Sequence, residues 1–121
     1  MILRHAAEMR EQQIPKMRDG TGVVTVRHLL EAEELLGKGR LFAHNVVPPG
    51  ASIGVHRHTG DAEAYYFLAG RGRYTDNGSA YEVVAGDLTF VSEGDLHGIE
   101  NTGDAPLEFV ALILYADKGG A

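Results

Sequence analysis

The sequence predicts an all-β fold, a sandwich or a barrel built as one domain, and three observations support this prediction. Short runs rich in β-branched and aromatic residues recur at close spacing, and turn residues separate them. Glycine accounts for 16 of the 121 residues without a Gly-X-Y period, which is typical of a fold with many turns. No long amphipathic helix competes with the strands, and the chain length fits one domain with a modest core.

The first 21 residues are charged and weakly patterned, and two interpretations of them stay open. Residues 6–13 could form a short helix, which Pro15 would end. The segment is then either a frayed tail or an arm that packs on a partner subunit. We therefore divide the chain into an N-terminal arm over residues 1–21, a β-barrel domain over 22–116 and a disordered tail over 117–121.

The first strands of the domain are expected between residues 22 and 70. Residues 23–26 are almost all β-branched and predict a strand, whereas residues 31–36 predict a loop with one helical turn. A second strand over 41–47 ends at two prolines and a glycine. A third strand over 53–58 ends at a polar turn, and a fourth over 63–69 ends at a glycine.

The second half of the domain contains the clearest hairpin. Two strands over residues 71–84 flank an Asn-Gly pair, and these two residue types accept the positive φ angles that a tight turn needs. Further strands are expected over 87–91, 97–101 and 107–115, and the last of these is the longest apolar run. The total of eight or nine short strands indicates a sandwich or a barrel.

Composition and charge argue against several classes of function. The formal net charge is -6 and the pI is about 5.4, which disfavours nucleic acid or an anionic membrane as the partner. Cysteine is absent, so His, Asp or Glu must hold any metal ion. No apolar run reaches the length of a membrane span, and the N-terminus lacks a signal-peptide pattern. We therefore expect a cytoplasmic protein.

Three histidines and one glutamate form the candidate site. His56 and His58 are two residues apart in a predicted strand, so their side chains point to the same face. Glu63 follows across a turn, and His97 comes from a distant strand. Three imidazoles and a carboxylate suit a divalent ion of the first transition row, although a His-x-His pair alone is only a moderate signal.

Glycines frame the first three of these residues at fixed distances. Gly50 precedes His56 with five residues between them, four residues separate His58 from Glu63, and six separate Glu63 from Gly70. This pattern resembles the first motif of the cupin superfamily, which is a glycine, five residues, His-x-His, three or four residues, Glu, six residues and a glycine. Every specified position matches.

The region around the third histidine resembles the second cupin motif. Gly86 is followed after five residues by Ser92, one intervening residue and Gly94; His97 comes two residues later, and Asn101 three residues after that. The one departure is Ser92, which stands where the family has proline. The change removes a rigid turn residue but no metal ligand.

The resemblance covers residues 50–101 and implies a double-stranded β-helix, the jelly-roll barrel of cupins. It assigns the metal ligands to His56, His58, Glu63 and His97, which would hold one divalent transition-metal ion: Mn, Fe, Co, Ni, Cu or Zn. The single short barrel is similar to small bacterial and archaeal cupins described as oxalate decarboxylase-like. Small cupins commonly pair through open sheet edges, so a homodimer is expected.

Strand parity suggests two candidate catalytic residues beside the metal. If Glu63 faces inward, Tyr65 on the same strand does too, and its hydroxyl is either a ligand contact or part of the barrel wall. Parity leaves open which face of residues 41–47 lines the pocket, so His44 is the second candidate. Otherwise His44 is an ordinary polar residue, as we expect for His5 and His28.

Three classes of function stay open. The first is an enzyme that uses the metal as a Lewis acid or an oxygen-activating site on a small carboxylate-like substrate, as an oxygenase, decarboxylase, lyase or isomerase. The second is a non-catalytic protein that holds or senses a small molecule on its metal. The third is a structural barrel without metal. No carboxylate clearly serves a decarboxylase, though Asp61 and Glu93 lie in expected loops.

Overall fold

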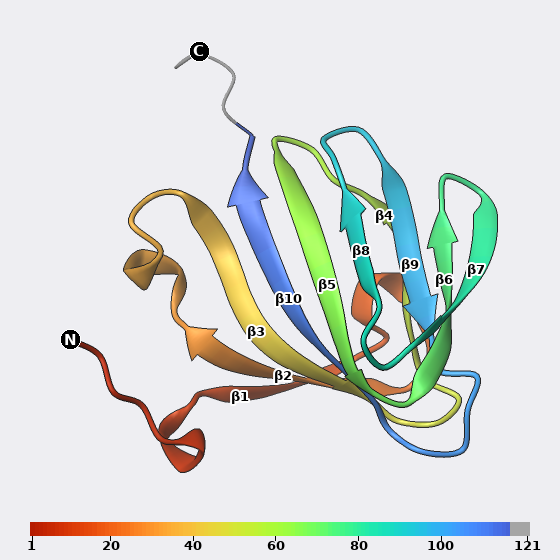
Figure 1. Ribbon diagram of the computed structural model, residues 1–121, viewed down its shortest axis with the longest axis horizontal. Coiled ribbons are helices and arrows are strands. Elements are labelled where there is room, and N and C mark those ends of the chain that lie inside the picture. The colour runs from red at the N-terminus through yellow and green to blue at the C-terminus, as the bar shows by residue number, and fades with distance from the viewer. Residues whose placement is uncertain (117–121) are drawn as a thin grey trace.

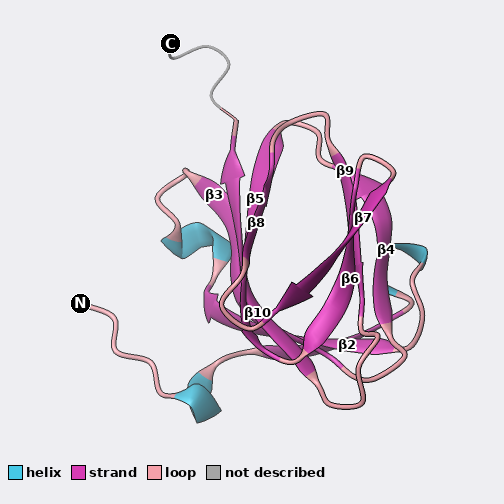
Figure 2. Ribbon diagram, turned by 45° about the vertical axis from the view of Figure 1, so that its right-hand side comes forward, coloured by secondary structure: helices cyan, strands magenta, loops and turns pink. Residues whose placement is uncertain are grey.

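Two antiparallel sheets face each other in the computed structural model, which describes residues 1–116 (Figures 1 and 2). The larger sheet has the strand order β1-β2-β3-β10-β5-β8, and the smaller sheet has the order β4-β9-β6-β7. This arrangement confirms the predicted all-β jelly roll. The expected tail over 117–121 lies outside the described residues.

Ten strands and three 3₁₀ turns make up the described part of the chain, and no helix in it is long and apolar enough to cross a membrane. The strands are β1 (Glu11–Pro15), β2 (Val23–Leu30), β3 (Gly39–Val47), β4 (Ser52–Arg57), β5 (Asp61–Ala69), β6 (Arg71–Asp76), β7 (Ser79–Val84), β8 (Leu88–Val91), β9 (Leu96–Glu100) and β10 (Leu107–Tyr115). The turns are η1 (Ala6–Glu8), η2 (Met17–Asp19) and η3 (Ala32–Glu34).

The hairpin β6–β7 forms as its turn residues predict. Asn77 and Gly78 have φ angles of 47° and 90°, and the flanking strands pair in register from Asp76 and Ser79 outward. Two adjacent residues with positive φ match the twist of the two strands, which is why the Asn-Gly pair is favoured here. Residues 31–36 also contain the expected single helical turn, η3.

The N-terminal segment differs from the expected short helix. Of residues 6–13 only η1 is helical, and β1 pairs with β2 at the edge of the larger sheet, where Ile14 lies opposite Val24. Sheet pairing gives the backbone groups of residues 11–15 partners that a short isolated helix could not keep in water. Residues 1–8 continue from β1 as an arm that projects from the body (Figure 1).

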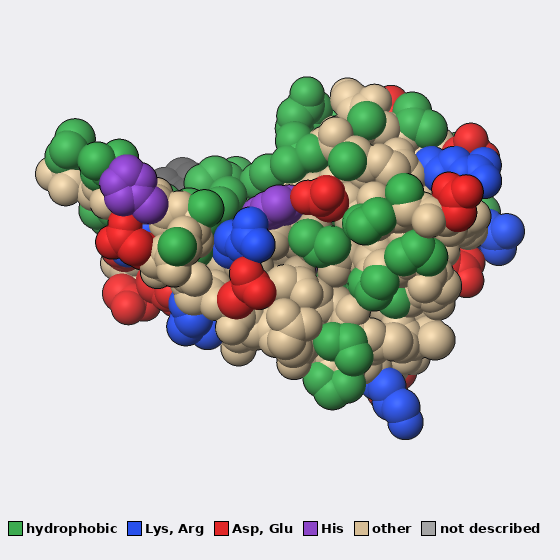
Figure 3. Space-filling model, turned by 90° about the horizontal axis from the view of Figure 1, so that it is seen from below, with side chains coloured by type: hydrophobic (Ala, Val, Ile, Leu, Met, Phe, Trp, Pro, Cys, Tyr) green, Lys and Arg blue, Asp and Glu red, His purple; other side chains and the backbone are tan. Residues whose placement is uncertain are grey.

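One bidentate ion pair holds this arm. Arg4 contacts Glu34 of η3 at 2.9 and 2.8 Å and also donates to the Leu29 carbonyl. Beyond it, Met1, Ile2 and Leu3 are exposed, and hydrophobic side chains gather at the tip of the protruding lobe in Figure 3. The arm is therefore attached by charge, while the side chains at its apolar end are exposed.

The core fills the space between the two sheets. Phe67 and Phe109 are fully buried and pack at a ring distance of 5.3 Å, with Tyr65 beside Phe109 at 4.3 Å. Alternate residues of β3, β5 and β10 point inward, so one face of the larger sheet is buried. These strands therefore supply the wall against which the candidate site is built.

The opposite face of the larger sheet is apolar and partly exposed. The pairing places Leu88, Tyr66, Val110 and His44 in one row across four strands. The next row contains Phe90, Ala64, Leu112 and Phe42. Leu88, Phe90 and Tyr66 have exposed fractions of 67%, 59% and 49%, so this outer face carries large apolar side chains without cover from the described chain.

Candidate metal centre

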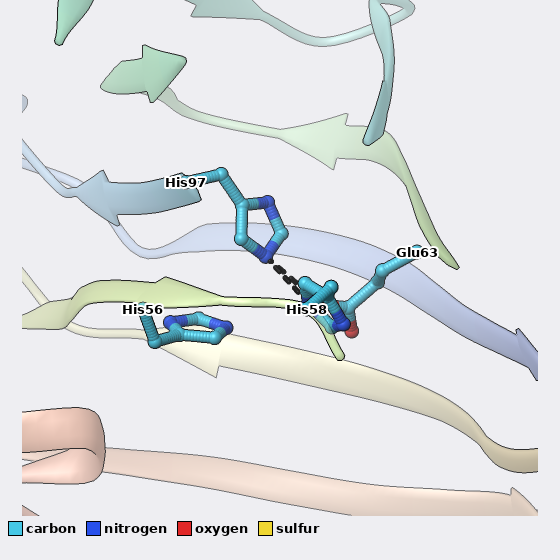
Figure 4. Close-up of side chains that lie close together, drawn as sticks. All are labelled: His56, His58, Glu63 and His97. Atoms are coloured by element: carbon cyan, nitrogen blue, oxygen red, sulfur yellow. Dashed lines mark hydrogen bonds and ion pairs between the residues drawn. The ribbon is translucent and has the colours of Figure 1, made fainter. Parts of the chain in front are cut away.

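The four residues predicted as ligands come together between the two sheets (Figure 4). His56 lies in β4 of the smaller sheet, His58 directly after it, and His97 in β9 opposite His56. Glu63 comes from β5 of the larger sheet. One ligand atom from each residue lies within 4.8 Å of the others, so residues far apart in the sequence meet at one point.

Three of the side chains are in direct contact. The Nε2 atom of His58 lies 2.9 Å from Oε1 of Glu63 and 2.9 Å from Nε2 of His97. His97 Nε2 lies 3.1 Å from the same carboxylate oxygen. The ring of His56 lies 4.7 Å from that of His97 and 5.2 Å from that of His58, so the three imidazoles surround one position.

Each imidazole is oriented by a bond at its other nitrogen. The Nδ1–H of His56 donates to the Gly54 carbonyl at 2.7 Å, and the Nδ1–H of His58 donates to Asp61 at 2.6 Å. Nδ1 of His97 lies 2.7 Å from the Tyr74 hydroxyl. With Nδ1 engaged, the lone pair at Nε2 is left for a metal ion, an arrangement usual for histidine ligands.

The protonation states suit a cation between the rings. Burial lowers the pKa of His56 to about 4, so this ring is neutral at pH 7. Burial opposes ionisation of Glu63, but hydrogen bonds from His58 and His97 outweigh it and lower the pKa of the carboxyl group. The Glu63 hydrogen bond raises the pKa of His58, so a proton competes with a metal ion at this imidazole.

The donor set therefore fits one divalent transition-metal ion. Three imidazole nitrogens and one carboxylate oxygen match the preference of first-row metals, and no thiolate is present in the sequence. Four protein donors leave two positions of an octahedral ion for a ligand. His58, Glu63 and His97 are 2%, 4% and 0% exposed, so any ligand must reach the site through a cavity.

A cavity of about 120 Å³ opens onto this site. Its lining combines the ligands His56, His58 and Glu63 with side chains of β1, η2, β2, β3 and β5, including Arg18, Asn45 and Tyr65. A cavity of this volume has room for several water molecules or for a small organic ligand.

The two candidate catalytic residues lie on different sides of the larger sheet. Tyr65 is 2% exposed, lines the cavity and packs against the His97 ring at 5.1 Å. His44 points to the outer face, where its Nε2 atom lies 2.8 Å from Glu108. Ala43, Asn45 and Val47 are buried residues of β3 on the opposite face from His44. The polar side chain of β3 that faces the cavity is therefore Asn45 and not His44.

Several residues around the candidate ligands were not predicted from the sequence. Asp61 bridges His58 and Arg40 at 2.6 and 2.7 Å, and its position three residues after a ligand histidine was the available signal. Tyr74 lies in a strand that neighbours β9, which no spacing rule reveals. Arg18 lies within residues 1–21, for which the sequence predicted no part in the site.

Comparisons with known proteins agree with the fold. The family model described as a cupin domain matches residues 43–113. An oxalate-binding protein of Thermotoga maritima is 45% identical over 94% of this chain and 93% of its own length. The crystal structure of a predicted oxalate decarboxylase from the same organism has a TM-score of 0.91 and 43% identity, covering 95% of this chain and 100% of that one.

A more distant relative carries the name of an enzyme. The oxalate decarboxylase OxdC of Bacillus subtilis is 35% identical over 59% of this chain, but the match covers only 20% of that protein. The family match spans more than half of the present chain, and the two sheets and the grouped ligands agree with it. The chain belongs to the cupin family.

Proposed function

We propose that this protein binds a small carboxylate on a divalent metal ion held by His56, His58, Glu63 and His97. The observation that carries the proposal is the grouping of these four donors beside a cavity of about 120 Å³, which three of them line. The similarity to a protein named for oxalate binding supports a carboxylate as the ligand. A bound ion would supply a Lewis acid that accepts carboxylate oxygens at its open positions.

The charges around the cavity suit an anion. Imidazoles that coordinate a metal ion carry no charge of their own, so Glu63 supplies the one negative charge among the four donors, and a divalent ion leaves a net positive charge at the site. Asp61 is paired with Arg40 and turned toward His58. Tyr65 keeps its proton because burial raises its pKa well above the usual value, so its hydroxyl can donate a hydrogen bond.

Calorimetric titration tests the proposal. Protein stripped with chelator and reloaded with Mn²⁺ is expected to bind oxalate, whereas stripped protein without added metal is not. The His97→Ala variant is expected to bind neither Mn²⁺ nor oxalate tightly. A thermal melt of the variant shows whether it still folds. Oxalate binding that is equal with and without metal would refute the proposal, and elemental analysis of untreated protein would identify the ion.

Catalysis on the same ligand is the second candidate, favoured by the similarity to the Bacillus subtilis decarboxylase. Within residues 1–116 the cavity lining contains no carboxylate besides Glu63, and the raised pKa of Tyr65 makes it a donor rather than a base. We therefore rank binding first. Release of formate and CO₂ from oxalate by the metal-loaded protein would reverse this order.

We also propose that two copies pair through the outer face of the larger sheet. Its exposed apolar side chains and the apolar tip of the arm are the features that support a homodimer. A cytoplasmic location stays a prediction from composition, which cell fractionation would test.

A further inference from the structure

Arg18 lies at the mouth of the cavity on a short segment with unusual backbone angles. Lys16, Arg18 and Asp19 have φ angles of 49°, 53° and 64°, in the left-handed region that non-glycine residues rarely adopt. Arg18 and Asp19 belong to η2, between β1 and β2, and Lys16 precedes it; Arg18 and Met17 line the cavity. Strained backbone of this kind concentrates at functional sites.

Close backbone packing fixes this segment to the strand that carries His56. A Cβ atom on Gly54 of β4 would lie 2.0 Å from the Arg18 carbonyl oxygen, and one on Gly20 would lie 2.3 Å from the Ser52 carbonyl oxygen. Only glycine permits such an approach. Arg18 therefore keeps a defined position relative to His56, two residues beyond Gly54.

The Arg18 guanidinium has no hydrogen bond or ion pair within the part of the chain that the structure describes. By contrast, Arg4, Arg10, Arg27 and Arg40 each contact a carboxylate. The charge nevertheless acts on the site: besides burial and His97, Arg18 helps to lower the pKa of His56. An unpaired guanidinium at the mouth of a cation-binding cavity is arranged for an anion that enters it.

Asn45 offers a second unpaired group in the same cavity. Its side chain is 2% exposed, and Oδ1 has no hydrogen-bond partner among the described residues. A buried polar group without a partner is destabilising unless something in the cavity satisfies it. The oxygen and nitrogen of a carboxamide exchange places by rotation about χ2, so Asn45 can present an N–H donor to an anion.

We infer that Arg18 and Asn45 form an anion-recognition subsite, which binds the carboxylate of a small dicarboxylate that is remote from the metal. This inference rests on the proposed function and specifies further that the ligand is a dianion. One carboxylate would occupy the metal side of the cavity, and the other would pair with the planar guanidinium, which matches carboxylate geometry. Selection for dianions over monoanions follows from this division.

The test compares oxalate with acetate on Mn²⁺-loaded protein by calorimetric titration. The Arg18→Asn variant removes the charge but keeps a residue type that tolerates the left-handed backbone. It is expected to lose about 10- to 100-fold in oxalate affinity, with acetate and Mn²⁺ affinities within about twofold of wild type. Arg18→Lys should retain part of the oxalate affinity, and Asn45→Leu should lose about fivefold.

Arg73→Asn is the matched control, because Arg73 is an exposed arginine of β6 outside the cavity. Its oxalate affinity should equal that of wild type. Oxalate binding by Arg18→Asn within about twofold of wild type would overturn the inference, and so would an equal loss of oxalate and acetate affinity. Wild-type protein that binds Mn²⁺ but neither anion would instead refute the proposed function itself.

Discussion

The three histidines of the site differ in the group that orients them. His56 donates to a backbone carbonyl, His97 contacts a phenol, and only His58 donates to a carboxylate, Asp61. Asp61 in turn accepts from Arg40, and this contact, with the one to His58, outweighs burial and lowers the pKa of the carboxyl group. A charged acceptor makes the opposite nitrogen of His58 a stronger donor to a metal ion.

We expect Asp61→Asn to weaken metal binding while the fold is kept. The amide has the same shape as the carboxyl group but accepts a weaker hydrogen bond and cannot pair with Arg40 as an ion. A decrease of about 10- to 100-fold in Mn²⁺ affinity follows from the usual effect of such partners. Calorimetric titration of the stripped protein measures this change.

The exposed turn residue Asp104 provides the control, since Asp104→Asn removes an equal charge outside the cavity. Its Mn²⁺ affinity should match that of wild type. An Asp61→Asn protein that is folded and binds Mn²⁺ as tightly as wild type would show that the His58–Asp61 contact has no part in metal binding.

Some site residues could be predicted from their spacing in the sequence, and others could not. His56, His58, Glu63 and His97 could be predicted, because the motif spacing encodes them together with their framing glycines. Tyr65 followed from parity with Glu63, although no observation yet tests a catalytic role. Asn45 could not be chosen over His44, because both faces of β3 mix apolar and polar residues; the pairing with β10 decides which one is buried.

At the scale of elements, the strands with strong turn signals were predictable and the N-terminal segment was not. The hairpin over residues 71–84 carries its turn chemistry in two adjacent residues. Residues 11–15 are polar and include Pro15, so their own propensity gives no strand signal. β1 forms because the edge of β2 offers it a partner, and that information lies outside the segment.

The attachment of the N-terminal arm is expected to depend on pH. The hydrogen bond from Arg4 lowers the pKa of Glu34 to about 2, below its ordinary value of 4.5. The contribution of the pair is therefore complete above pH 4.5 and is lost as the pH falls through 2. Hydrogen exchange of the Glu8 and Met9 amides, which donate within η1, should lose protection over this range.

Glu34→Gln provides the comparison at neutral pH. It removes the charge that Arg4 contacts, so its arm amides should exchange at pH 7 as the wild-type arm does at low pH. Amides of β10 should stay protected in both proteins, because β10 pairs with strands on both sides. Equal protection of the arm in wild type and Glu34→Gln would show that the ion pair does not hold it.

At the scale of the whole molecule, one surface stands out. The outer face of the larger sheet carries two rows of mainly apolar side chains, with the His44–Glu108 pair among them. Monomeric proteins rarely expose a continuous apolar face of this kind. The pair would give such an interface a polar contact that fixes its alignment.

Phe90→Glu is expected to convert a dimer into a monomer. Phe90 is 59% exposed on this face, and a charge there would be buried without a partner if two copies met. Sedimentation velocity measures the mass of both proteins. Val55→Glu is the control, because Val55 is 56% exposed on β4 of the smaller sheet and its change should leave the dimer intact. A monomeric wild-type protein would exclude this interface.

The donors of the centre are divided between the two sheets, and this division limits which molecules the protein can accept. Glu63 belongs to the larger sheet, whereas His56 and His97 belong to the smaller one. A ligand larger than the cavity would meet side chains of both sheets, and moving the sheets apart to admit it would lengthen the distance from the Glu63 carboxylate to the imidazoles. The packing of the two sheets would therefore set both the size of the ligand and the affinity for a metal ion.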